Sequence, residues 1–164
     1  MRVVCPGYQN EHFPVLRAEQ LRLGLEEQVV FLGFVTAAEL RALYDLAEFV
    51  VFPSLHEGLG FPVIEAMRAG LPLAAARTPV IAEVAGDAAL LFDPTSVEDI
   101  ARALESLMTS QRLRSELRRR GRDQAARYSW RASAVAHQAL YRYVAGRPLT
   151  HDERDLLASC ALVL

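Results

Sequence analysis

Short apolar runs alternate along this chain with longer stretches in which apolar residues recur at the period of a helix. The runs predict five strands, at residues 2–6, 29–32, 49–52, 71–76 and 89–92. They are almost continuously apolar, as in the strands of a parallel sheet that helices cover on both faces. This alternation predicts an α/β fold: a Rossmann-like, doubly wound parallel sheet of about five strands with right-handed crossovers.

Two helices are predicted between the first three strands. Residues 11–23 repeat apolar side chains at helical spacing, and Gly24 provides a helix stop. The next helix begins after Thr36, because Glu39 follows three residues later with the spacing of a capping box. The apolar residues expected on the buried face of this second helix are Leu40, Leu43 and Leu46.

The pattern changes after Phe92. Three more helices are predicted, at residues 96–107, 112–127 and 129–144, and no further strand follows them. We therefore expect one domain over residues 1–145 and a C-terminal tail over residues 146–164. Residues 156–164 show no clear pattern.

Composition and charge exclude several classes of function. Of the 164 residues, 52% are hydrophobic, which is enough for a buried core, and the formal net charge is −2. A domain that binds nucleic acid through its phosphates normally carries a strong positive excess, so we expect no nucleic-acid partner. All 18 basic residues are arginines, which excludes chemistry that needs a lysine amine.

Cysteine usage and the lack of membrane signals indicate a reduced, cytoplasmic setting. Cys5 and Cys160 are too few and too far apart in sequence for a disulfide framework or a metal cluster. No apolar run reaches the roughly 18 residues of a membrane-spanning helix, and the N-terminus lacks the order of a signal peptide. We expect at most peripheral contact with the inner face of a membrane.

The loop after the third predicted strand is the best candidate for a ligand site, because open parallel sheets bind ligands outside the carboxyl ends of their strands. Gly58 and Gly60 let backbone amides approach a ligand, and Pro62 suits the first turn of a helix, whose N-terminal end favours a phosphate. Glu57 and Glu65 flank this loop, and a carboxylate accepts hydrogen bonds from two neighbouring hydroxyls. A nucleotide sugar, which carries both phosphate and hydroxyl groups, fits this combination.

A purely structural interpretation accounts for the same residues. In it, the glycines only make a tight turn, Glu57 is a solvated loop residue, and Glu65 is an acid near a helix start, where the dipole favours it. A loop with two glycines is a weak signal, so spacing alone leaves both interpretations open.

A longer series of residues resembles the donor domain of the family 4 retaining glycosyltransferases. That domain carries a glutamate, seven residues and a second glutamate, which matches Glu57 and Glu65 within the segment PSLHEGLGFPVIEAM. The resemblance covers about residues 1–145, and its other matches, in the family's order, are residues 31–35, 43–44, 69–72, 82–89, 92–94 and 128–130. It implies one half of a GT-B fold, in which the C-terminal domain binds the nucleotide sugar and the N-terminal domain binds the acceptor.

The resemblance also implies roles for individual residues. Glu57, the catalytic candidate, would contact hydroxyls of the donor sugar, and Glu65 would hold the ribose. The remaining candidates for substrate binding approach the sugar and diphosphate or lie beside the base; they are Gly58, Leu59, Gly60 and Phe61, and Gly33, Phe34 and Val35. The donor would be a nucleotide diphosphate sugar, with no metal ion or other cofactor. The acceptor is unknown, and a glycan or a lipid-linked acceptor is expected.

Two parts of the family's pattern are missing here. Members place a strand, a glycine–arginine loop and a lysine ahead of the point where this chain begins, and those cations stabilise the leaving diphosphate. The N-terminal acceptor domain is missing as well. In the family's sheet the absent strand lies between the strands that correspond to residues 2–6 and 49–52, so its loss would open the middle of the sheet. We therefore expect the isolated chain to transfer no sugar to an acceptor.

Other residues with reactive or aromatic side chains are weighed against structural roles. His56 is expected to support its loop rather than to catalyse, and for Glu83 a structural and a ligand-facing role stay open. Asp87 and Asp93 have the sequence context of turn residues. Trp130 is expected to anchor the last helix rather than to stack on a base.

Three functions remain. The first is the donor-binding part of a retaining, metal-independent glycosyltransferase. The second is a non-catalytic nucleotide-sugar-binding module or one half of a split enzyme, which the missing cationic loop favours. The third is an epimerase of similar fold that acts on nucleotide sugars without an acceptor.

Overall fold

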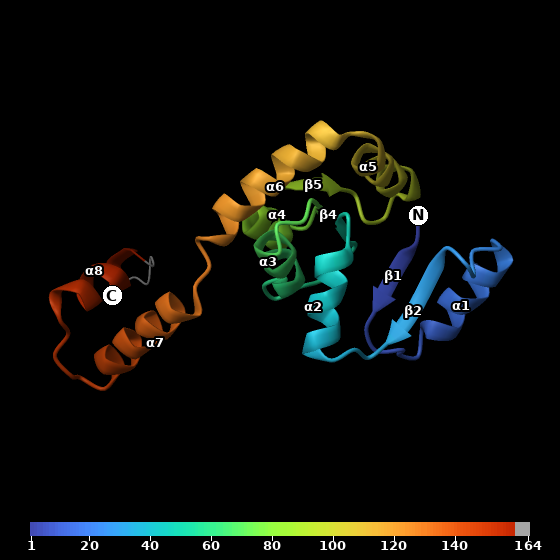
Figure 1. Cartoon of the computed structure of the whole chain (residues 1–164). Helices are drawn as coiled ribbons and strands as arrows, with labels where there is room; N and C mark the ends of the chain where they lie inside the picture. The colour runs from blue at the N-terminus through green and yellow to red at the C-terminus, as the bar shows by residue number, and fades with distance from the viewer. Residues whose placement is uncertain (160–164) are drawn as a thin grey trace. The chain divides into compact units, whose positions relative to one another are not determined.

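A computed structural model describes residues 1–159 of the chain, which form two compact units, one of residues 1–48 and one that begins at Phe49 (Figure 1). The elements of the first unit are β1 (Val3–Pro6), α1 (Phe13–Arg22), β2 (Val29–Gly33) and α2 (Ala37–Leu46). Those of the second unit are β3 (Val50–Phe52), α3 (Phe61–Arg68), β4 (Leu73–Ala76), α4 (Pro79–Ala85), β5 (Ala89–Phe92), α5 (Val97–Thr109), α6 (Gln111–Ala125), α7 (Trp130–Val144) and α8 (His151–Ser159). The predicted alternation of strands and helices, followed by helices alone, is confirmed.

The five strands are parallel, as predicted, but they form two sheets. β1 pairs with β2, and β4 lies between β3 and β5. Within residues 1–159, β1 and β3 are not hydrogen-bonded to each other, and each has a single strand partner.

The core of the second unit surrounds β4, all four residues of which are completely buried. On one face, Ala74 and Ala76 join a cluster that includes Phe92 from β5 and Leu107 from α5. α3 and α4 also pack against β4 and bury Met67 and Ile81. Three of the four β4 residues are alanines, and their small side chains let the helices come close to the sheet.

The first unit has little buried surface. Its one buried residue among those described is Gln20 of α1, whose amide nitrogen donates to Val29 O at 2.5 Å. Beside this contact, the Phe13 and Phe31 rings meet edge to face with centroids 5.2 Å apart. A two-stranded sheet and two short helices cannot enclose a full core, so a polar anchor and an aromatic pair hold α1 to β2.

The predicted buried face of α2 is confirmed only in part. The capping box forms: Glu39 N donates to Thr36 Oγ1 at 3.3 Å, and Thr36 N donates to Glu39 Oε2 at 2.7 Å. Leu40 and Leu43 are half-buried, but Leu46 is 83% exposed, so its prediction is wrong. Leu46 is the last residue of α2, and Ala47 already has an extended backbone.

A hydrogen-bond centre ties the end of α6 to α4. The buried Gln124 amide donates to Val84 O at 2.9 Å, and the Tyr128 hydroxyl donates to the same carbonyl at 3.2 Å. The Arg68 guanidinium at the end of α3 donates to Tyr128 O. Val84 lies near the C-terminus of α4, where carbonyls lack partners within the helix. The Gln124 and Tyr128 side chains therefore supply the hydrogen bonds that this carbonyl would otherwise lack.

Removing the buried amide should destabilise the protein. We expect Gln124→Ala to lower the free energy of unfolding by about 1–3 kcal/mol, because it deletes a buried hydrogen bond and leaves a void. Gln111→Ala, at the exposed start of the same helix, should change it by less than about 0.5 kcal/mol. Urea unfolding followed by circular dichroism measures both, and equal effects would contradict the role given to Gln124.

Candidate functional site

The loop between β3 and α3 has the predicted form of a strand, a glycine turn and a helix start. Gly60 is the N-cap of α3, and Pro62 lies in the first turn. Gly60 has no side chain that could cap this end. Val63 N bonds to Gly60 O at 3.0 Å, which closes the first turn. The helix therefore begins with backbone amides that a ligand can approach.

Gly60 and Gly58 are glycines for different reasons. Gly60 is buried and has φ +78°, and a Cβ built on it would lie 2.7 Å from Cδ1 of the buried Ile81. Both the backbone conformation and the space exclude a side chain there. Gly58 has no such φ, and a Cβ built on it would meet nothing within 4 Å. The fold therefore requires glycine at position 60 but leaves open space at position 58.

The two glutamates lie at the two ends of this turn. Glu57 is half-buried in the loop, two residues after Leu55, and Glu65 is exposed on the second turn of α3. The Ser54 hydroxyl donates to His56 O at 3.1 Å, which supports the loop just before Glu57. His56 itself is exposed. The arrangement offers carboxylates on both sides of a turn whose backbone is accessible at Gly58.

The aromatic residue at the start of α3 has an unexpected partner. Phe61 stacks on Trp130, the first residue of α7, with ring centroids 5.5 Å apart and an interplanar angle of 21°. Trp130 is 73% exposed, but its stacking on Phe61 links the start of α7 to α3, in agreement with the anchoring role predicted for it. α7 also packs against α8, where the Arg142 guanidinium lies 2.9 Å from the Glu153 carboxylate.

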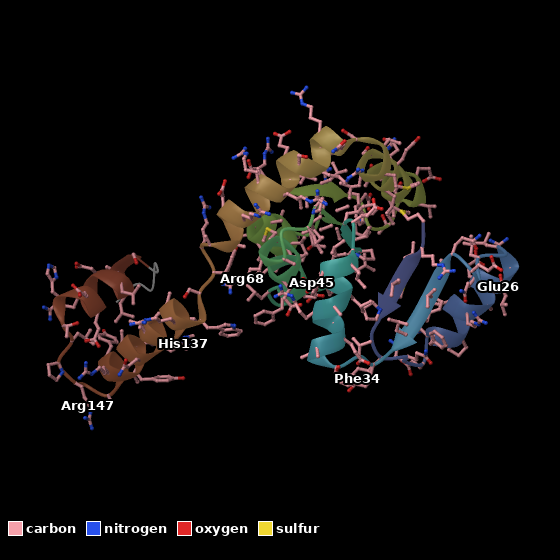
Figure 2. All side chains as sticks on the ribbon, viewed as in Figure 1. Glu26, Phe34, Asp45, Arg68, His137 and Arg147 are labelled. Atoms are coloured by element: carbon pink, nitrogen blue, oxygen red, sulfur yellow. The ribbon has the colours of Figure 1, made fainter. Side chains whose placement is uncertain are left out.

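The remaining predicted site residues lie in the first unit, at the carboxyl end of β2 (Figure 2). Gly33 ends the strand with φ +70°, and Val35 is half-buried. Phe34 is exposed, and its ring lies against that of Tyr8, which follows β1. Sequence reasoning did not single out Tyr8. Its position in the sequence, two residues after the end of a strand and next to a glycine, could have marked it as a candidate.

Charged groups at the carboxyl ends of β4 and β5 have structural roles. The Arg77 guanidinium donates to Leu91 O at 2.9 Å, which holds it toward β5. Hydrogen bonds from the Thr95 side chain and backbone lower the pKa of Asp93, which confirms the predicted turn role of this carboxylate. Glu83 is exposed on α4, and its role stays open.

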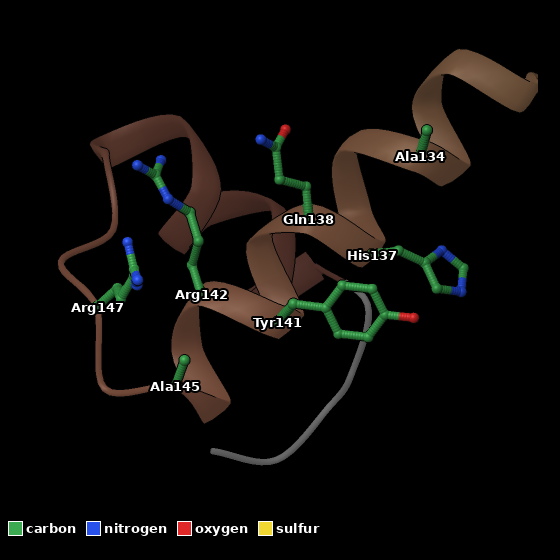
Figure 3. Close-up of a pocket in the computed structure, with 7 residues that line it drawn as sticks. All are labelled: Ala134, His137, Gln138, Tyr141, Arg142, Ala145 and Arg147. Atoms are coloured by element: carbon green, nitrogen blue, oxygen red, sulfur yellow. The ribbon is translucent and has the colours of Figure 1, made fainter.

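Two hollows of the surface lie away from these residues. One, of about 550 Å³, runs along α7 and is lined by Ala134, His137, Tyr141, Arg142 and Arg147, among others (Figure 3). Its His137 and Tyr141 rings point to one side of the helix and Arg142 to the other, so they do not converge on a ligand. The other, of about 310 Å³, lies beside α1 and β2. Neither is lined by Glu57, Glu65 or the glycines between them.

Within residues 1–159, no group of three histidine, cysteine, aspartate or glutamate side chains is placed to hold a metal ion. Over the same residues, no helix combines the length and the apolar character needed to cross a membrane.

Comparison with known families shows to which family the chain belongs. The profile of the family Glycosyl transferases group 1 matches residues 2–124, three quarters of the chain. The chain belongs to this family. Over 113 residues, 69% of the chain, it is 40% identical to the serotype-specific mannosyltransferase WbdA of Escherichia coli, of which it spans 14%.

Solved structures show the same fold. Sucrose-phosphate synthase from Thermosynechococcus elongatus matches 88% of the chain with a TM-score of 0.80 at 22% identity, and the chain covers 39% of it. HepE from Anabaena, in complex with UDP-glucose, matches 77% with a TM-score of 0.70 at 22% identity, and 36% of it is covered. The Rossmann-like fold of GT-B glycosyltransferases is therefore confirmed for this member of the family. The chain spans less than half the length of each of these proteins.

The contrast between the two glycines predicts a contrast in stability. Gly60→Ala should lower the free energy of unfolding by about 2 kcal/mol or more, because it combines a left-handed alanine with a clash against Ile81. Gly58→Ala, the matched control, should change it by less than about 1 kcal/mol. Thermal and urea unfolding measure both. Equal tolerance of the two substitutions would contradict the packing described for Gly60.

Proposed function

We propose that this chain is the donor-binding part of a retaining glycosyltransferase that uses a nucleotide diphosphate sugar without a metal ion. The observation that carries the proposal is the turn from Glu57 to Gly60. Its backbone leaves open space at Gly58, it precedes a helix start with no side-chain cap, and a half-buried carboxylate adjoins it. A diphosphate fits the amide-rich end of α3, and sugar hydroxyls fit the carboxylate.

Family membership supports the same assignment. The 40% identical relative is named a mannosyltransferase, and the solved HepE structure carries UDP-glucose. In our proposal Glu57 contacts the donor sugar, Glu65 holds the ribose, and residues 33–35 lie beside the base. The Gly58–Phe61 backbone approaches the sugar and diphosphate. The acceptor is a glycan or a lipid-linked sugar, and the protein works in the cytoplasm with at most peripheral membrane contact.

Donor binding is the direct test. Titration calorimetry with GDP-mannose and with UDP-glucose should detect binding of at least one donor by the 164-residue chain. Glu65→Ala should weaken that binding about tenfold or more, since hydrogen bonds to a charged group are worth about 1.5–3 kcal/mol. Glu105→Ala, an exposed acid on α5, is the control and should leave the affinity within twofold. If the chain binds none of the nucleotide sugars tried, the proposal is wrong.

The role of Glu57 has its own readout. Glu57→Gln should weaken binding of the nucleotide sugar more than binding of the nucleoside diphosphate, because in our proposal the Glu57 carboxylate contacts only the sugar. Calorimetry with UDP-glucose and UDP, or with GDP-mannose and GDP, measures this difference. An equal loss of affinity for the nucleotide sugar and for the nucleoside diphosphate would contradict the contact between Glu57 and the sugar.

A second function is one half of a split enzyme. The family resemblance gives the stabilisation of the leaving diphosphate to an arginine loop and a lysine, and the 164 residues contain no lysine. We therefore expect the chain alone to bind a donor but to transfer no sugar. Product analysis after incubation with donor and a mixed glycan acceptor checks this. Transfer by the chain alone would refute the expectation. Transfer restored by an added acceptor domain would favour the split enzyme, and isomerised donor without acceptor would identify an epimerase.

A further inference from the structure

A row of apolar and aromatic side chains lies exposed along one side of α7, within the second unit. We call this row the α7 stripe; it consists of Trp130, Ala134, His137, Tyr141 and Val144. Its members follow one another at intervals of three or four residues, which places them on one face of the helix. All five are exposed, and the exposed fraction is 73% for Trp130, 68% for Tyr141 and 76% for Val144.

The stripe lies on the opposite side of α7 from its buried residue. Within α7, Ala139 alone is buried, and it lies half a turn around the helix from Trp130. α7 packs against α8, to which Arg142 is joined by an ion pair. Figure 3 shows the His137 and Tyr141 rings on one side of α7 and Arg142 on the other. The packing of α7 within the protein therefore leaves the stripe in contact with water.

The sequence around the stripe carries only positive charge. No aspartate or glutamate occurs from residue 124 to residue 151, whereas four arginines do: Arg127, Arg131, Arg142 and Arg147. Arg142 is paired at 2.9 Å with Glu153, one of the acids of α8 that follow this segment. The other three arginines are exposed and form no ion pair within residues 1–159. Because the whole chain has a net charge of −2, this positive excess is local.

This combination of side chains fits the surface of an anionic bilayer. Helices that lie in such a surface carry aromatic and apolar residues together with basic ones. Tryptophan and tyrosine favour the boundary between lipid tails and headgroups, because each has an apolar ring and one polar group. A second copy of this chain fits less well, since a symmetric contact would bring the same arginines close to one another. The family profile ends at residue 124, so the stripe lies outside the matched part of the chain.

We propose that the α7 stripe, together with Arg127, Arg131 and Arg147, binds the surface of an anionic lipid bilayer. The helix lies along that surface, with the aromatic rings among the headgroups and the guanidinium groups on the lipid phosphates. The inference goes beyond the proposed function, which leaves the surface for peripheral membrane contact unassigned. Binding to vesicles is measured without nucleotide, so the membrane surface and the donor site can fail separately.

The fluorescence of Trp130 provides a direct test. Trp130 is the one tryptophan of the 164 residues, so its emission reports on the α7 stripe. Vesicles of equal parts phosphatidylglycerol and phosphatidylcholine should shift this emission to shorter wavelength, and lipids brominated on their acyl chains should quench it. Vesicles of phosphatidylcholine alone should bind about tenfold more weakly or less, and added salt should weaken binding to the anionic vesicles.

Substitutions separate the stripe from the rest of the surface. Arg131→Ala should weaken binding to the anionic vesicles about fivefold. Tyr141→Ala should weaken it about threefold or more, because affinity scales with the apolar area that enters the interface. The controls lie on α2 of the first unit: Arg41→Ala removes the same charge, and Leu46→Ala removes an apolar side chain that is 83% exposed. Both controls should stay within twofold of the parent.

All four substituted side chains are exposed, so every variant should unfold at the same urea concentration as the parent. A loss of vesicle binding in Arg131→Ala or Tyr141→Ala then reports on the surface and not on the fold.

The other outcomes overturn the inference. Failure to bind anionic vesicles, or equal binding to neutral and anionic ones, removes the membrane surface and leaves the donor site standing. Binding without a change in Trp130 emission and without quenching by brominated lipid places the contact elsewhere on the chain. A shift that appears without lipid as the protein concentration rises, together with a doubled mass by sedimentation equilibrium, makes the α7 stripe an interface between two copies instead.

Discussion

Helix α3 begins where it does because one backbone position is locked against the core. Gly60 adopts a left-handed conformation directly beside Ile81, a side chain that is completely buried between α4 and its neighbours. Any side chain at position 60 would push on that core. The turn that carries the proposed ligand site is therefore held by the packing of the second unit, around the fully buried strand β4. A rigid support of this kind is what positions functional groups on loops.

The same turn contains a position on which the fold makes no demand. Gly58 has open space around it and an ordinary φ, so neither packing nor backbone conformation explains the glycine. In the proposed function, the close approach of a ligand explains the glycine at position 58. The packing of the fold explains the glycine at position 60 alone.

The two units reach stability by different means. The second unit buries apolar side chains on both faces of β4. The first depends on a buried glutamine, an edge-to-face aromatic contact and the tie between Gly7 and Gly33. A unit with so little core leaves large apolar side chains in solvent, among them Val15, Leu16 and Leu21 of α1.

Local pattern determined most of the elements. Residues 89–92 were predicted as a strand and form β5 with the same limits, and Thr36 with Glu39 forms the predicted capping box. Both features depend on neighbours in sequence, whose chemistry a single chain reveals. The Glu57 to Glu65 loop was recognisable for the same reason, since its residues are contiguous. What the tertiary structure alone decided concerns residues far apart in sequence. The exposure of Trp130, the clash that reserves position 60 for glycine, and the meeting of Tyr8 with Phe34 all depend on which distant segments lie side by side.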